Sequence, residues 1–256
     1  MAFKNDYTLG KGKFYFRRFL PGTETPEPGG FRRVGNVPTA TVSQTREKLD
    51  HTSSEGGINV KDDSVTTSQD SAIAFTTDNV SMDNLAMWFN STVSDVIEAG
   101  GAVVAEPIPD VVLGTFYQLG ETPTTPQGAR GISAVAVKKG ATVFDVNDDY
   151  KVDLATGMLE IIDGGAIVAG DDITVDYTVP AGTRRVILGD NDTLEGQFKF
   201  IADNPKGTNK DTFWPRVQLS PDGDYALIGT DWQTVGFAVD VLQASDGSPR
   251  SITEQR

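Results

Sequence analysis

The sequence predicts a mainly β protein: a β-sandwich or barrel-like domain with one short flanking helix and long loops. Short runs rich in Val, Ile, Thr, Phe and Tyr are separated by turn-forming residues, among them 27 Gly and 13 Pro. One of these runs alternates apolar and polar residues with a period of two, as a half-buried strand does. The 256 residues are 38% hydrophobic, which is enough to build the core of a domain of this class.

The clearest predicted strand is DITVDYTV, residues 172–179. Its packed face would carry Ile173, Val175, Tyr177 and Val179. Further strands are expected where the composition is similar, at 14–20, 39–47, 70–78, 132–139, 158–162, 195–202, 214–220, 224–232 and 235–243. Ser-Pro-Asp-Gly-Asp at 220–224 is typical of a turn, because Pro fixes φ and Gly accepts a positive φ. We therefore predict a hairpin over 214–232.

One segment has helical instead of strand periodicity. It follows Ser81, a suitable N-cap residue, and its apolar residues group at helical spacings: Met82, Leu85, Met87, Trp88 and Phe89. This pattern predicts a short amphipathic helix that covers the open side of the sandwich. We favour this packing role for Trp88 over a contact with a cofactor.

Long connections separate some of the strands. Residues 1–38 are expected to form an N-terminal arm and a Pro/Gly-rich loop, and 21–38 cannot be regular structure. Residues 49–69 form a polar, Ser/Thr-rich loop that is either mobile or used for contact. Residues 244–256 form a C-terminal tail, and 120–185 contributes extra hairpins. Residues 1–256 are interpreted as a single β domain.

The composition excludes several kinds of catalytic and metal-binding site. Cys is absent and His51 is the single His, so disulfides, thiol catalysis and ordinary zinc sites lack their ligands. A Ser/His/Asp triad would have to use His51, which has no nucleophile motif beside it. Gly10 and Gly12 match neither phosphate-binding glycine pattern. We therefore predict no catalytic, cofactor-binding or metal-binding residues, and we do not expect an enzyme.

The acidic residues raise two alternatives. Oxygen ligands stand at the odd positions of a calcium loop: Asp145, Asn147, Asp149 and Asp153. Tyr150 and Thr156 replace the Gly and Glu that this loop needs, so a solvated hairpin edge is favoured. A carboxylate-dependent hydrolase would instead require acids to converge in one pocket, for example Asp145, Asp149, Asp190 and Asp192.

The charge is strongly acidic and unevenly distributed. Its net value of −14, from 36 acidic and 22 basic residues, argues against binding to nucleic-acid phosphates. Residues 1–48 hold nine basic and four acidic residues, which leaves 13 basic and 32 acidic residues elsewhere. This asymmetry either helps identical copies join head to tail or is a basic arm on an acidic domain. No segment is typical of a signal peptide or a membrane span, so we expect a cytoplasmic chain without membrane contact.

The order of the elements carries further information. A polar strand pair with a long Ser/Thr-rich connection is followed at once by DNLAMWF, and then by YKVDLATGMLEI and GDNDTLEGQFKFIADNPKG. The closing strands lie in FWPRVQLSPDGDYALIGTDWQTVGFAVDVL. This order resembles the major tail tube proteins of long-tailed, siphovirus-like bacteriophages over nearly the whole chain. Residues 120–185 depart from the pattern, as either a family decoration or an insertion.

The resemblance implies a virion structural protein with a tail tube fold. Six copies would close into a ring, and rings stacked head to tail would build the tube that delivers the genome. Residues 49–69 would reach an adjacent ring. The implied partners are further copies, the tape measure protein in the lumen, the tail terminator and distal tail proteins, and DNA in transit without sequence-specific binding. The chain would assemble in the host cytoplasm and reside in the virion tail; the alternative is a β-rich binding or adhesion module of a virion.

Overall fold

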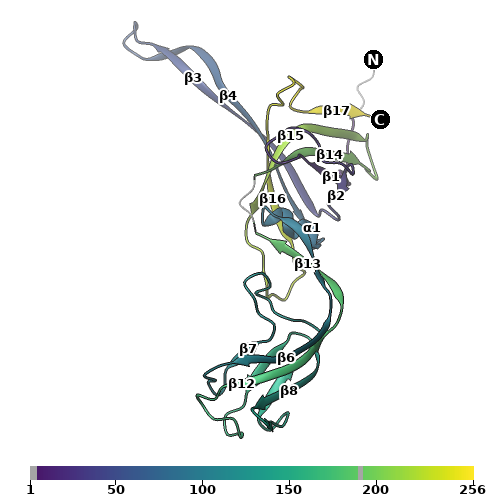
Figure 1. Ribbon diagram of the computed structural model, residues 1–256. Helices are drawn as coiled ribbons and strands as arrows, with labels where there is room; N and C mark the ends of the chain where they lie inside the picture. The colour runs from purple at the N-terminus through teal and green to yellow at the C-terminus, as the bar shows by residue number, and fades with distance from the viewer. Residues whose placement is uncertain (1–4, 190–192) are drawn as a thin grey trace. The chain divides into compact units, whose positions relative to one another are not determined.

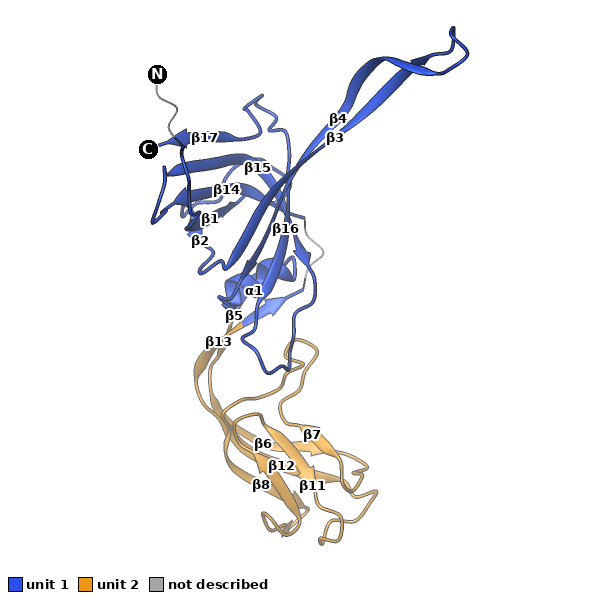
Figure 2. Ribbon diagram, turned by 180° about the vertical axis from the view of Figure 1, so that it is seen from behind, with its two compact units in different colours: residues 1–94, 186–256 blue, residues 95–185 orange. Residues whose placement is uncertain are grey.

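The computed structural model describes residues 5–189 and 193–256 and has the predicted mainly β, sandwich-like fold built from antiparallel sheets. The chain divides into two compact units (Figure 2): unit 1 contains residues 1–94 and 186–256, and unit 2 contains 95–185. The stretch 120–185, expected to add hairpins, lies within unit 2. In the described part of the chain, no helix is long and apolar enough to cross a membrane.

Unit 1 is built on a large antiparallel sheet (Figure 1). Its strands are β1 (Gly12–Arg18), β2 (Arg32–Arg33), β3 (Thr39–Ser53), β4 (Val60–Thr77), β14 (Leu194–Ala202), β15 (Lys210–Asp222), β16 (Val235–Val241) and β17 (Ile252–Gln255). The strand order is β2-β1-β14-β15-β16-β4-β3, and β17 pairs with β15. The sheet therefore ends at β3 on one side and at β2 and β1 on the other.

Stacked aromatic rings form the centre of the unit 1 core. Phe75 lies between Phe198 and Phe237, with ring centroids 5.4 and 5.0 Å apart. Phe14 stacks on Phe198 at 5.2 Å, and Trp214 lies 5.8 Å from Phe198. The rings come from five strands, and aromatic side chains bury more apolar area than other residues. These contacts hold β1, β4, β14, β15 and β16 in one packed layer.

The predicted helix is present as α1 (Met82–Trp88). Ser81 caps it, because its side chain accepts a hydrogen bond from the Asn84 amide. Met87 is buried, and Trp88 is partly buried against the unit 1 core, in agreement with the predicted packing role. Phe89 lies after the last helical residue and is exposed, so it is not part of the packed face.

The polar connection predicted at 49–69 is mostly strand, so its interpretation as a loop is wrong. β3 and β4 continue to pair through Leu49↔Val65 and as far as Ser53↔Val60, and only 54–59 connects them. Ser, Thr and Val suit a strand that is exposed on both faces, and two irregularities in the register absorb the extra residues. β4 pairs with β16 only from Ala72 onward. We call residues 44–71, which extend beyond this pairing, the arm.

The predicted hairpin at 214–232 is also wrong. β15 runs to Asp222 and pairs with β16, from Asp222↔Gly236 to Val217↔Val241, and 224–232 is not a strand. Pro221 fits inside β15 because β14 pairs only as far as Leu219, which leaves β15 open on that side. The turn begins at Gly223, with φ of +73°. We call residues 223–234 the β15–β16 loop.

Short strands also occur in two stretches where regular structure was not predicted. Within 21–38, β2 pairs with β1 through Tyr15↔Arg33 and Phe16↔Arg32. Within 244–256, β17 pairs with the start of β15, from Phe213↔Ile252 to Lys210↔Gln255. Both strands are too short to give a period-two signal, and both depend on a partner that is distant in sequence.

Unit 2 has its own core and its own sheets. Its strands are β6 (Gly101–Ile108), β7 (Phe116–Gln118), β8 (Ser133–Lys139), β9 (Thr142–Val143), β10 (Tyr150–Asp153), β11 (Met158–Ile161) and β12 (Ile173–Val179). They form sheets in the orders β6-β12-β8-β9 and β10-β11-β7. The alternation predicted for β12 is confirmed, since Ile173, Val175 and Tyr177 are buried. The chain passes between the units in β5 (Thr92–Glu98) and β13 (Gly182–Leu188), which pair with each other.

Candidate functional site

The arm extends from the sheet of unit 1 as a two-stranded ribbon (Figure 1). Almost every residue along it is exposed, on both faces of β3 and β4. A two-stranded ribbon without a further layer is at best marginally stable in water. The arm is therefore a surface that would gain stability by packing against another molecule.

Polar side chains link the two strands of the arm. Asp50 accepts hydrogen bonds from Lys61 Nζ at 2.6 Å and from Ser64 Oγ at 2.7 Å. The bond from Lys61, followed by that from Ser64, lowers the pKa of Asp50. His51 Nδ1 lies 2.5 Å from Asp62 Oδ1. The hydroxyl of Ser64 is directed to Asp50 instead of His51, so these residues form links between the two strands of the arm.

Apolar side chains are exposed on the same arm. Leu49 and Val65 are paired directly across the strands, and Ile58 and Val60 lie at the distal end. Side chains of this kind are depleted on the free surfaces of exposed strands, where they promote association. The arm thus combines exposed apolar side chains with two strands whose backbones are hydrogen-bonded to each other.

The arm is continuous with an open sheet edge. β3 is the last strand of the large sheet within residues 5–189 and 193–256, so its outer backbone groups have no neighbouring strand there. Open edges can pair with a strand of another chain, and natural proteins usually cover them. The edge of β3 is the second feature that favours association.

The β15–β16 loop presents a third exposed surface. Leu227, Ile228 and Trp232 are highly exposed, so the apolar run before and within Gly-Thr-Asp-Trp forms a surface loop instead of the predicted strand. The loop is braced, because Gln233 Nε2 donates to Ala226 O at 2.9 Å and Tyr225 packs near Trp88 at 6.1 Å. This surface was not predicted, because its apolar residues have the composition of a buried strand.

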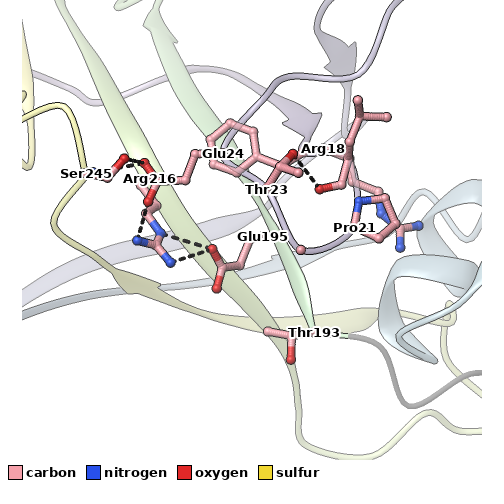
Figure 3. A pocket seen from close by; sticks show the side chains of 11 residues that line it. Arg18, Pro21, Thr23, Glu24, Thr193, Glu195, Arg216 and Ser245 are labelled. Carbon is pink, nitrogen blue, oxygen red and sulfur yellow. Dashed lines mark hydrogen bonds and ion pairs between the residues drawn. The ribbon is translucent and has the colours of Figure 1, made fainter.

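A polar cavity in unit 1 has a structural explanation (Figure 3). Arg216 contacts Glu24 Oε1 at 2.5 Å and Glu195 Oε2 at 2.9 Å. Glu24 in turn accepts bonds from the Ser245 amide and hydroxyl, at 2.9 and 2.8 Å, and the amide is the larger cause of its lowered pKa. These contacts connect the segment around Glu24, two core strands and the chain after β16. The arrangement is a clamp of paired charges.

The acidic residues considered for calcium or hydrolysis lie in turns of unit 2. Asp149 is buried and accepts bonds from the amides of Asp145 and Ala166, so the predicted solvated edge is wrong for this residue. Asp145, Asn147 and Asp153 are exposed, as a solvated edge requires. Asp190 and Asp192 lie outside the described residues. Within the described part of the chain, no group of three metal-ligating side chains is placed to hold an ion.

The fold and these surfaces define an antiparallel β protein with a projecting two-stranded arm and an open sheet edge. The protein family described as "Protein of unknown function UCP028589" matches residues 7–249, and the chain belongs to this family. The match spans nearly the whole chain and includes both units. The curated proteins contain no significant match.

Proposed function

We propose that this chain is a structural virion protein that self-assembles into stacked hexameric rings and so forms a phage tail tube. The arm is the observation that carries this proposal, because it is a long exposed ribbon with an apolar pair and no layer of its own chain over it in the described residues. Such a ribbon has a physical use when a neighbouring copy covers it. The resemblance to tail tube proteins in the order of elements supports the same function.

In the proposed ring, the open edge of β3 pairs with the opposite sheet edge of the next copy. That opposite edge consists of β1 and β2. Val34 N donates to Phe14 O and Glu27 N donates to Arg18 O along the outer side of β1, so the proposed contact would run along β2 and its flanking residues. Pairing of unlike edges is a heterologous contact, and it closes into a ring when the rotation between copies is a divisor of a full turn. Closure of the ring removes both open edges, and covering an edge in this way prevents uncontrolled pairing with other chains.

In the proposed tube, the arm reaches from one ring to the next. The tape measure protein would occupy the lumen during assembly, with tail terminator and distal tail proteins at the two ends. DNA would then pass without sequence-specific binding, and the net charge of −14 would oppose adhesion of its phosphates. The protein would assemble in the host cytoplasm and reside in the virion tail. It is not proposed to be an enzyme.

A second candidate function is a β-rich binding or adhesion module of a virion. The observation that favours it is unit 2, which has a separate buried cluster and is a compact body of the size of a small binding domain. On this alternative, the exposed loops would bind a foreign ligand, and the protein would remain a monomer or small oligomer at every concentration.

Electron microscopy of the purified full chain over a concentration series, together with light scattering, separates the two functions. Self-assembly predicts rings or tubes of uniform width whose length increases with concentration. A particle of constant small mass over the whole series would contradict self-assembly by the chain alone and favour the binding module.

A further inference from the structure

An apolar groove of about 550 Å³ opens on unit 1 between β1 and the start of β3. Its walls include Phe14, Val42, Ile73, Phe200 and Trp214. Phe14 and Phe200 contact each other, with ring centroids 4.8 Å apart. Phe200 can lie over β1 because Gly12 has no side chain; a Cβ there would be 2.4 Å from the Phe200 ring. The shape of the groove therefore depends on a specific residue, Gly12, and its volume is typical of ligand-binding sites.

The charged residues that line this groove, in the described chain, are both basic. Lys11 is on the β1 side and Lys210 begins β15. Lys210 Nζ also lies 3.8 Å from Asp6 Oδ2, so its charge is partly balanced. An occupant that fits the groove would combine large apolar side chains with acidic residues.

The β15–β16 loop has this combination. Ile228 is 96% exposed and Trp232 is 94% exposed, and the loop is held in shape by the Gln233 and Tyr225 contacts described above. Asp224 and Asp231 are its charged residues, and the loop contains no Lys or Arg. Its chemistry is complementary to that of the groove in both polarity and sign.

The loop of one chain is far from the aromatic wall of its own groove. Gly223 follows Trp214 by nine positions along the extended β15, a separation of about 30 Å. A loop of twelve residues, going out and returning, reaches only about 20 Å from its root. The loop therefore cannot fill its own groove as far as Trp214, and a second copy is the occupant that the chain itself provides.

We infer that the β15–β16 loop of one copy inserts Ile228 and Trp232 into the apolar groove of a second copy. Asp224 and Asp231 then face Lys11 and Lys210 of that copy. The inference rests on the proposed self-association and names one of its contact surfaces. Because loop and groove are different surfaces, the contact is heterologous, and it propagates until the copies close into a ring or continue as a filament.

The test uses two full-length variants that each lose one side of the contact. The loop variant carries Ile228→Ser and Trp232→Ser, and the groove variant carries Val42→Asp, which places an acid in the groove. Val112→Asp is the matched control, because Val42 and Val112 are both 56% exposed and Val112 lies in unit 2. Thermal denaturation shows whether each variant folds as the unsubstituted chain does.

Native mass spectrometry of an equimolar mixture, with one variant isotopically labelled, gives the decisive readout. Each variant alone should lose the contact, whereas the mixture restores one intact loop and one intact groove. We expect mixed pairs to exceed same-variant pairs by about tenfold, which corresponds to ~1.4 kcal/mol. If the copies associate through the arm instead, mixed pairs should be no more frequent than random pairing gives. A mixture of either variant with the Val112→Asp control should also show no excess of mixed pairs, because the control keeps both the loop and the groove.

Two results would overturn the inference in different ways. If the unsubstituted chain assembles and both variants assemble equally well, the loop–groove contact is wrong and self-assembly stands. If the unsubstituted chain remains a monomer at every concentration and no mixed pairs form, both the contact and self-assembly by the chain alone are wrong.

Discussion

Leu49 on β3 and Val65 on β4 lie directly opposite each other in the arm, and they are 66% and 57% exposed. Directly opposite residues of an antiparallel pair share one face of the ribbon. A pair of this kind stabilises the ribbon by about 0.2–1 kcal/mol, which is too little to hold a ribbon of this length without other contacts. The exposed pair is therefore more useful as a contact surface than as a core.

We predict that replacing both residues, Leu49→Ser with Val65→Ser, weakens assembly without unfolding the chain. The concentration at which light scattering shows growth should rise by about tenfold or more, since two apolar contacts of ~1 kcal/mol each are lost. Val168→Ser in unit 2 is the control, because Val168 is similarly exposed and lies outside the arm. Growth at the original concentration would show that the arm does not contribute to association.

The aromatic core of unit 1 gives a stability prediction. Phe198 is fully buried between Phe14, Phe75 and Trp214. Phe198→Ala should lower the free energy of unfolding of unit 1 by about 3–5 kcal/mol, through lost burial and a residual cavity. Urea denaturation followed by tryptophan fluorescence measures this unit specifically, because all three Trp residues lie in it.

The exposed Phe89, which lies in the same unit, provides the comparison for Phe198. Phe89→Ala removes the same side chain from a surface position of unit 1 and should change the stability of that unit by about 1 kcal/mol or less. Equal effects of the two substitutions would mean that the stack around Phe198 does not stabilise the fold.

Local sequence patterns predict those parts of the fold that depend on local physics. The alternation in 172–179 identifies β12 because one of its faces is buried and the other is solvated. Ser81 and the helical spacing after it identify α1, since the cap and the apolar stripe are both encoded within a few residues. These elements need no knowledge of a distant partner.

The candidate contact surfaces are harder to predict because burial does not determine them. The arm has no apolar alternation, so its strand state depends on a long register with β4 and appears in the sequence as a polar loop. The apolar residues Leu227, Ile228 and Trp232 resemble a buried strand although they are exposed. Sequence patterns report apolarity, whereas the structure distinguishes apolar residues in a core from those on a surface.

Asn84 gives a prediction about α1. Its side chain is fully buried, donates to the carbonyl oxygens of Val34 and Asn79 at 2.7 Å each, and accepts from Arg32 at 2.8 Å. Asn84→Ala should cost about 2–4 kcal/mol, because it leaves several buried polar groups without partners. The loss should exceed that of Ser81→Ala, which removes one cap and costs about 1 kcal/mol. Urea denaturation of both variants measures the difference between their free energies of unfolding. A smaller loss for Asn84→Ala than for Ser81→Ala would contradict the stabilising role of the buried Asn84 hydrogen bonds.

The last prediction concerns acid stability and Asp149 in unit 2. Hydrogen bonds from the amides of Ala166 and, second, Asp145 lower the pKa of Asp149 below its ordinary value of 3.8. The unfolded chain lacks these bonds, so it binds a proton at this residue more readily than the folded chain does. The stabilisation is therefore fully present above about pH 3.8 and is lost as the pH falls below that value toward the lowered pKa of the folded state.

Replacing Asp149 by Asn should lower the melting temperature of unit 2 at neutral pH and reduce its further decline below about pH 3.8. Differential scanning calorimetry between neutral pH and pH 3 measures both effects, and tryptophan fluorescence identifies the transition of unit 1, which contains all three Trp residues. Asp145→Asn is the matched control: it makes the same charge change in the same turn, but Asp145 contributes its backbone amide, which the substitution keeps. If the Asp149 and Asp145 variants show the same acid response, the buried carboxylate does not couple protonation to the stability of this unit.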